Sequence, residues 1–119
     1  MAIIKTFHEI LAWQKGHNIA LEIYTVTSKF SESEKFGLVS QMRRCAVSIP
    51  SNIAEGFKRK TMKDSVHFYN ISEGSLEELK YQLLLSKDLG YINGVIYKNL
   101  TTLTDEVGRI LCGWIKIQK

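Results

Sequence analysis

The sequence predicts an all-α protein, an up-down-up-down antiparallel four-helix bundle formed by a single domain over residues 1–119. Apolar residues recur at helical spacing in four segments of the chain, each long enough for a bundle helix. Three of these segments begin with a hydroxyl residue placed three positions before a carboxylate, which is typical of helix starts. The single proline argues against an all-β fold rich in turns.

The first helix is expected over residues 7–29. Thr6 stands three positions before Glu9, the capping-box spacing, in which the hydroxyl accepts from a free backbone N–H and the acid reaches back. Its apolar series is Ile10, Trp13, Ala20, Ile23, Thr27 and Phe30.

The second helix is expected over residues 32–59, because Ser31 and Glu34 repeat the capping-box spacing. Its apolar series is Leu38, Met42, Cys45, Ile49 and Ile53. Pro50 falls inside this segment, where it removes one backbone hydrogen bond and crowds the preceding turn. Since the apolar steps continue across the proline, we expect a kink near Pro50 and not a break.

The third helix is expected over residues 62–88, with Thr61 and Asp64 as a weaker capping pair. Its core-facing series is rich in small residues, which permits close approach of a neighbouring helix: Phe68, Ser72, Ser75, Leu79, Leu83 and Ser86.

The fourth helix is expected over residues 94–117, starting after Asn93. Gly90 suits the left-handed residue that ends the preceding helix. The apolar residues of this segment step alternately by four and three, a heptad pattern that we expect to face the core: Ile96, Leu100, Leu103, Val107, Ile110, Trp114 and Ile117. The connections are short, so neighbouring helices should run antiparallel.

Composition excludes several classes of protein. No segment approaches 18 consecutive apolar residues, so no membrane span is expected. The first residues lack the long apolar stretch of a signal peptide, and the two cysteines form no CxxC pair. We therefore expect a cytoplasmic protein without a disulfide framework or a zinc site.

The sequence lacks the residue patterns that an enzyme active site or a metal site of a helical bundle would need. A di-iron bundle needs carboxylates from all four helices and two acid-x-x-His pairs, but only Asp64 and His67 have that spacing. Cys45 falls on the buried series of its helix, where a thiol is usually inert. Gly-rich phosphate loops are absent. We expect no catalytic residues, no metal, no cofactor and no small-molecule substrate.

Several motifs together resemble the four-helix-bundle family of 23S rRNA intervening-sequence proteins, over nearly the whole chain. They are Trp13-Gln14-Lys15, Gly37-Leu38, the run from Ser40 to Arg44, the run from Ser48 to Gly56, Gly74-Ser75, Glu78-Leu79 and Leu89-Gly90-Tyr91. The resemblance implies a homopentamer without enzymatic activity, whose genes were noticed inside insertions in bacterial 23S rRNA genes. A similar pentameric bundle serves diversity-generating retroelements as an accessory to a reverse transcriptase and its RNA.

Arg43 and Arg44 have two interpretations. If the second and third helices turn around near residue 60, Arg43 is level with Glu78 and Arg44 with Glu77. Arg–carboxylate pairing, between helices or across a subunit contact, is the interpretation we favour over contact with phosphate.

A basic cluster follows at the corner between these two helices. Lys58, Arg59, Lys60 and Lys63 lie next to the start of the third helix, whose free N–H groups attract anions. Residues 31–63 carry seven Lys and Arg against three Glu, a net charge of +4. The cluster is therefore the candidate nucleic-acid-binding site, and an ordinary solvated corner is the alternative.

The outer flank of the second helix carries a polar series of Gln41, Arg44, Ser48, Ser51 and Glu55. This flank suits a contact between protomers, in which Arg44, Asn52 and Glu55 satisfy one another; a solvated helix face is the alternative. The apolar arc of the helix covers roughly half its circumference, more than one core needs. Together with the family resemblance, this arc favours a homo-oligomer.

Two functions therefore remain open. The first is a homo-oligomeric module, pentameric as the resemblance implies, that binds RNA or a ribonucleoprotein through the basic corners of a ring. The second is a structural or protein-interaction scaffold that binds no nucleic acid, its Arg and Glu residues serving contacts within and between subunits.

Overall fold

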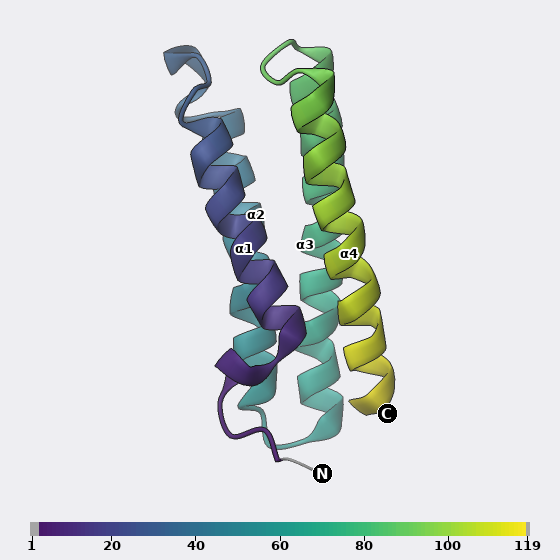
Figure 1. Cartoon of the computed structure of the whole chain (residues 1–119). Coiled ribbons are helices and arrows are strands. Elements are labelled where there is room, and N and C mark those ends of the chain that lie inside the picture. Colours follow the sequence, from purple (N-terminus) through teal and green to yellow (C-terminus); the bar gives the residue numbers. More distant parts are fainter. Residues whose placement is uncertain (1–2, 119) are drawn as a thin grey trace.

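The computed structural model describes residues 3–118 and consists of four long helices and two short 3-10 turns. The elements are η1 Phe7–Glu9, α1 Leu11–Thr27, η2 Glu32–Glu34, α2 Leu38–Phe57, α3 Met62–Asp88 and α4 Gly94–Gln118. Each helix lies beside the next one in the chain and runs antiparallel to it, and α4 returns beside α1 (Figure 1). The bundle measures 46 × 25 × 19 Å. The predicted up-down-up-down four-helix bundle is confirmed.

The predicted starts of α3 and α4 are confirmed in atomic detail. The Thr61 hydroxyl accepts a hydrogen bond from the Asp64 backbone N–H at 3.1 Å, and the Asn93 side-chain oxygen accepts from the Ile96 N–H at 2.9 Å. Gly90 adopts the left-handed conformation (φ +84°) after the end of α3. These local signals therefore fixed both ends of the α3–α4 connection.

The first two capping pairs begin 3-10 turns, so the predicted starts of α1 and α2 at residues 7 and 32 are wrong. Glu9 accepts from the backbone N–H of Thr6 at 2.9 Å, and this bond holds the pKa of Glu9 below its usual value. Ile10 then turns extended, which lets its side chain enter the core with 1% of its surface exposed. Helix α1 accordingly begins only at Leu11.

The turn at Ser31 is separated from α2 by a bend at Gly37 (φ −109°, ψ −109°). Glu34 bridges the bend, because its carboxylate accepts from the Leu38 backbone N–H at 3.2 Å and from the Tyr91 hydroxyl at 2.8 Å. This tertiary contact redirects the chain, and α2 begins at Leu38.

Helices α2 and α3 approach closely through small residues, as the sequence predicted. The Ser72 hydroxyl donates to the carbonyl of Ile49 at 2.8 Å, and the Cys45 thiol donates to the carbonyl of Ser75 at 2.9 Å. At Gly56 a Cβ atom would lie 2.6 Å from the Tyr69 ring, so only glycine fits. The two helices are thereby held in a single register.

Helix α2 continues through Pro50 without a break. On the side of α2 that packs against α1, Gly16 of α1 faces Pro50. A Cβ atom at Gly16 would lie 3.2 Å from the Ile49 side chain and 3.6 Å from the Pro50 nitrogen. The missing side chain at Gly16 therefore lets α1 cross α2 closely at the point where α2 lacks one N–H group.

The predicted apolar series of α2 is fully buried, whereas that of α4 is only partly so. The residues of α4 that are buried are Leu100, Thr104, Val107, Leu111 and Ile115. Leu103, Ile110 and Trp114 are half-buried, and Ile117 is 74% exposed, so its assignment to the core was wrong. A straight α-helix drifts by about 20° per heptad relative to a seven-residue repeat, so over three heptads the series leaves the core.

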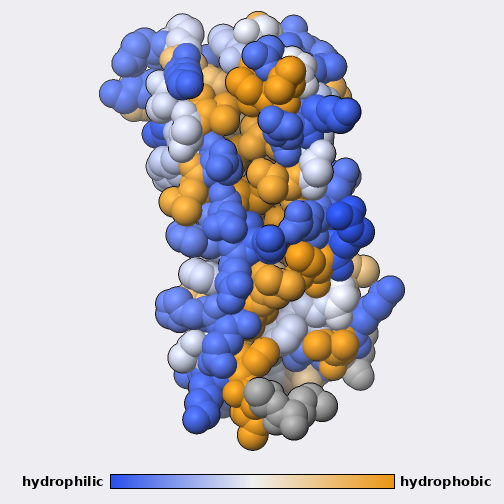
Figure 2. Space-filling view, viewed as in Figure 1, coloured by the Kyte–Doolittle hydropathy of each residue, from blue (hydrophilic) through white to orange (hydrophobic). Residues whose placement is uncertain are grey.

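Apolar surface is visible along the junction of α1 and α4, where the bundle is least closed (Figure 2). Hydrophilic side chains interrupt it near the middle of the molecule. An ion pair spans the same two helices, with 3.0 Å between Lys15 Nζ and Glu106 Oε1.

The burial pattern of α4 predicts unequal costs for two truncations. Leu111→Ala removes a side chain with 0% exposure and should lower the free energy of unfolding by about 2–5 kcal/mol. Ile117→Ala, the matched control on the same helix, should change it by less than about 0.5 kcal/mol. Urea denaturation followed by circular dichroism measures both. Equal effects would show that the heptad series, and not the observed stripe, forms the core.

Candidate nucleic-acid interface and subunit-contact surfaces

The predicted basic cluster lies at the exposed turn between α2 and α3. We call Lys58, Arg59, Lys60 and Lys63 the basic corner; all four side chains are exposed. Three of them, together with Asp64, line a shallow hollow of about 280 Å³. The corner is positioned by the Thr61 cap, which starts α3 directly beside it. Cationic side chains next to a helix N-terminus form a surface suited to phosphate groups.

Arg59 differs from the lysines of the basic corner because it is engaged within the chain. Its Nη1 lies 3.4 Å from Glu55 Oε1, and its guanidinium stands 4.9 Å from the centre of the Phe68 ring. Such an exposed ion pair contributes at most about 1 kcal/mol. Lys58, Lys60 and Lys63 make no ion pair with any residue of the described range 3–118. Three lysines per chain are thus available to an external anion.

Within the chain Arg43 does not pair with Glu78, so the predicted pairing between α2 and α3 is not formed there. Its Nε donates to the Thr27 hydroxyl at 3.0 Å and its Nη2 to the Tyr24 carbonyl at 3.4 Å. The guanidinium also stacks over the Tyr24 ring, 4.5 Å from the ring centre. Arg43 does lie at about the same height along the bundle as Glu78, as predicted, but its side chain points towards α1 and away from α3.

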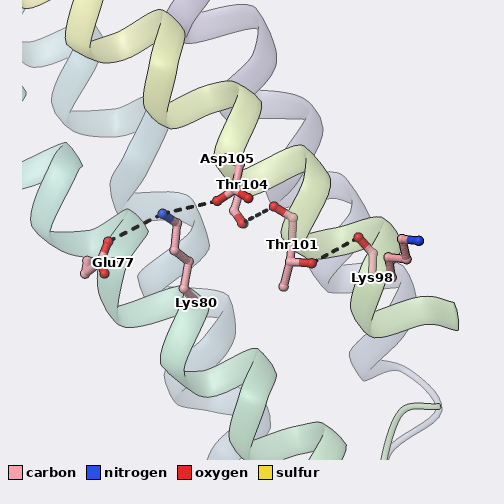
Figure 3. Close-up of polar contacts among 6 residues, drawn as sticks. All are labelled: Glu77, Lys80, Lys98, Thr101, Thr104 and Asp105. Atoms are coloured by element: carbon pink, nitrogen blue, oxygen red, sulfur yellow. Dashed lines mark hydrogen bonds and ion pairs between the residues drawn. The ribbon is translucent and has the colours of Figure 1, made fainter. Parts of the chain in front are cut away.

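Arg44 and Glu77 are not paired either. Figure 3 shows Glu77 beside Lys80, whose Nζ lies 3.5 Å from the Glu77 carboxylate and 3.3 Å from that of Asp105 on α4. Glu77 therefore belongs to the α3–α4 side of the bundle. Arg44 is exposed and has no ion-pair partner between residues 3 and 118.

Within one chain, Arg44, Asn52 and Glu55 do not contact one another, and the contact between protomers that the sequence suggests stays a prediction. Asn52 donates to the carbonyl of Ser48 at 2.8 Å and to its hydroxyl at 2.9 Å, and Ser48 is 2.8 Å from the Ser75 hydroxyl on α3. Glu55 pairs with Arg59 instead. Gln41 is exposed, and Glu78 accepts from Gln82 Nε2 at 3.3 Å. These contacts are local, and they leave Arg44 and Glu78 without a charged partner in the described part of the chain.

An apolar groove between α1 and α2 is the surface that sequence reasoning missed. We call it the α1–α2 groove; it measures about 390 Å³ and is lined by Phe7, Trp13, His17, Ala20, Leu21, Tyr24, Val47, Pro50, Ser51 and Ala54. None of these lining residues is Lys, Arg, Asp or Glu. The wide apolar arc of α2 predicted the α2 side of the groove. The α1 side was not predicted, because the sequence pattern placed Trp13 in the core.

Cys45 is buried, and burial, assisted by the charge of nearby Glu78, raises the pKa of its thiol to about 12. A thiol that stays protonated is a poor nucleophile. Within residues 3–118 no three His, Cys, Asp or Glu side chains are grouped to hold a metal ion. In the same range, none of the helices combines the length and the hydropathy needed to cross a bilayer.

Comparison with known proteins adds a family to this description. Residues 8–113 match the family described as 23S rRNA-intervening sequence protein. A crystal structure of a protein of unknown function from the S23 ribosomal protein family of Bacteroides thetaiotaomicron is 25% identical, with a TM-score of 0.79. That likeness covers 89% of this chain and 99% of the other. A search of curated proteins gave no match.

The two cysteines should differ sharply in reactivity. At pH 8 Cys112, which is exposed, should react with an aromatic disulfide reagent, whereas Cys45 should react only after unfolding because its pKa of about 12 keeps the thiol protonated. Counting released thiolate spectroscopically, without and with guanidinium, measures both. Cys112→Ser is the control and should abolish the native reaction. Two thiols reacting rapidly in the native protein would contradict the burial of Cys45.

Proposed function

Because the chain belongs to the family of 23S rRNA-intervening sequence proteins, we propose that it is a non-enzymatic homo-oligomer, a ring of five bundles, that binds RNA weakly through its basic corners. The observation that carries the proposal is the exposure of Lys58, Lys60 and Lys63 at one turn, without ion-pair partners among residues 3–118. An RNA or a ribonucleoprotein would meet these lysines at the end of the bundle.

The exposed apolar side chains support assembly of several copies. In the α1–α2 groove, Leu21 is 55% exposed and Tyr24 46%, and Val47 beside them is 39% exposed. Contiguous apolar surface of this kind typically marks a contact with another protein. The number of five follows what the family resemblance of the sequence implies, a homopentamer.

Repetition of the corner supports RNA binding by the ring more than by one chain. Three lysines are too few to hold RNA at physiological salt, because each phosphate contact contributes little and is screened. Linked corners raise the effective concentration of one another when a single RNA reaches several of them. The binding would depend on the phosphate backbone and show little preference for sequence.

A scaffold without nucleic-acid binding is the second candidate, and one observation favours it. Arg43 and Arg59, two of the six cations considered for phosphate contact, are engaged within their own chain. The groove contains no Lys or Arg for contact with phosphate, and an apolar surface of this kind is typical of a protein contact. Binding measurements at low salt distinguish the two candidates, since a scaffold shows no affinity for RNA.

We expect the protein to form a pentamer in solution. Light scattering coupled to gel filtration should give about five times the chain mass of 13.6 kDa. A single species with the mass of one chain at micromolar concentration would refute the ring.

RNA affinity should depend on the basic corner and on salt. Fluorescence anisotropy with labelled structured and single-stranded RNA should show binding at about 50 mM salt that falls at least about tenfold at 200 mM. The variant Lys58→Gln, Lys60→Gln and Lys63→Gln should lose most of this affinity while keeping the wild-type mass. The matched control replaces three lysines elsewhere, Lys29→Gln, Lys98→Gln and Lys116→Gln, and should bind nearly as wild type. No binding at low salt would favour the scaffold, and equal loss in both variants would contradict a localised site.

A further inference from the structure

We infer that adjacent copies in the ring meet by placing the outer flank of α3 of one copy in the α1–α2 groove of the next, with Arg44 of one copy paired to Glu78 of the other. The inference rests on the proposed ring and identifies its contact surfaces. It follows from the residues that each surface exposes, from their heights along the bundle and from the angle between the two faces.

The receiving surface extends beyond the apolar groove. Above it on the same face, a second hollow is lined partly by residues shared with the groove, Tyr24 and Val47, and partly by Phe36 and Arg44. Phe36 is 90% exposed. The face therefore presents apolar side chains over much of its length and three cations in the second hollow. Arg43 is engaged by Thr27, whereas Lys35 and Arg44 have no ion pair within residues 3–118.

The inserted surface is a stripe on the outer flank of α3, which we call the α3 stripe: Ile71, Gly74, Glu78 and Tyr81. These positions follow one another at steps of three and four, so they share one side of the helix. Ile71 is 39% exposed and Tyr81 61%, so the stripe presents two large hydrophobic side chains to the surroundings of the chain. A Cβ atom at Gly74 would meet no atom within 4 Å, so another backbone can approach the helix there.

The two surfaces match in height. Copies in a closed ring are related by rotation alone, so in a ring whose bundles stand parallel to its axis, a residue of one copy lies level along the bundle with the same residue in every other. Within the chain, the thiol contact puts Cys45 opposite Ser75, and the hydroxyl contact puts Ile49 opposite Ser72. Continuing this register to within about one residue, Val47 is level with Gly74 and Pro50 with Ile71.

The same register brings opposite charges together. Arg44 lies level with Glu78 to within about one residue, and neither has a charged partner among residues 3–118. Arg44 stands at the edge of the groove face, and Glu78 is at the centre of the α3 stripe. Charge complementarity thus coincides with the apolar match, which favours a second copy of this chain as the occupant of the groove.

The angle between the two faces suits a small closed ring. The α1–α2 face and the outer flank of α3 next to α2 are neighbouring sides of a four-helix bundle, about 90° apart in a square arrangement. A ring of five requires about 108° between the two contacts of each copy, whereas faces on opposite sides of the bundle would generate an open filament. The strongly charged α3–α4 side, with Lys80 and Asp105, remains on the outside of the ring.

Charge reversal tests the contact. Arg44→Glu and Glu78→Arg should each place like charges against one another and lower the mass measured by light scattering about fivefold, to that of one chain. Mixing the two purified variants should restore a large species, because each supplies the charge that the other lacks. A pair within one chain gives no such rescue in trans, so mixing separates the two possibilities.

Two further variants distinguish loss of the subunit contact from loss of the folded structure. Glu73→Arg makes the same charge change on an exposed position of α3 outside the α3 stripe, and should leave the ring intact. Gly74→Trp adds bulk where the chain itself leaves open space, so helicity by circular dichroism should stay unchanged while the mass falls.

The outcomes separate this inference from the proposed function. If the wild-type protein is a ring and Arg44→Glu, Glu78→Arg and Gly74→Trp all keep its mass, the interface lies elsewhere and this inference is overturned, while the ring stands. If the wild-type protein has the mass of one chain, the ring itself fails, and the inferred contact between copies fails with it. Loss of the ring in Glu73→Arg as well would show a general charge effect and would also overturn the inference.

Discussion

The close approach of α2 and α3 is the constraint on which the rest of the structure depends. Hydroxyl and thiol groups of small residues reach backbone carbonyls of the facing helix, from Ser72 to Ile49 and from Cys45 to Ser75. Gly56 gives the space that the Tyr69 ring fills. Because these contacts join side chain to backbone in a buried setting, sliding one helix by a turn would leave the polar groups unsatisfied.

This constraint also decides what each flank of α2 presents. With the small-residue face turned to α3, Arg43 is directed to α1, where Thr27 and the Tyr24 ring hold it. Gly16 then lets α1 pack against Pro50, and the side chains that do not fit between the two helices remain at the surface. The apolar groove therefore results from the way α1 and α3 pack against different sides of α2. Apolar side chains of α1 and α2 that are not covered by this packing line the groove.

Local sequence signals determined the parts of the fold that local chemistry controls. Thr61, Asn93 and Gly90 fixed the ends of α3 and α4, because a cap needs only its own few residues. The buried series of α2 and the small residues of α3 were also predicted. The starts of α1 and α2 were not, since burial of Ile10 and the contact of Glu34 with Tyr91 join residues far apart in sequence and override the local capping pattern.

For the candidate site, the sequence alone located the basic corner and the position of Arg43 and Arg44 along α2, because turn position and helical rise are properties of the chain itself. Only the tertiary structure decided the direction of the charged side chains: Arg43 points to Thr27 and Tyr24 of α1, and Glu77 lies beside Lys80, which also reaches Asp105 of α4. The heptad series of α4 failed for the same reason at Ile117, which is 74% exposed. Periodicity gives the spacing of residues along a helix, but the rotation of that helix about its axis is set by the neighbours that pack against it.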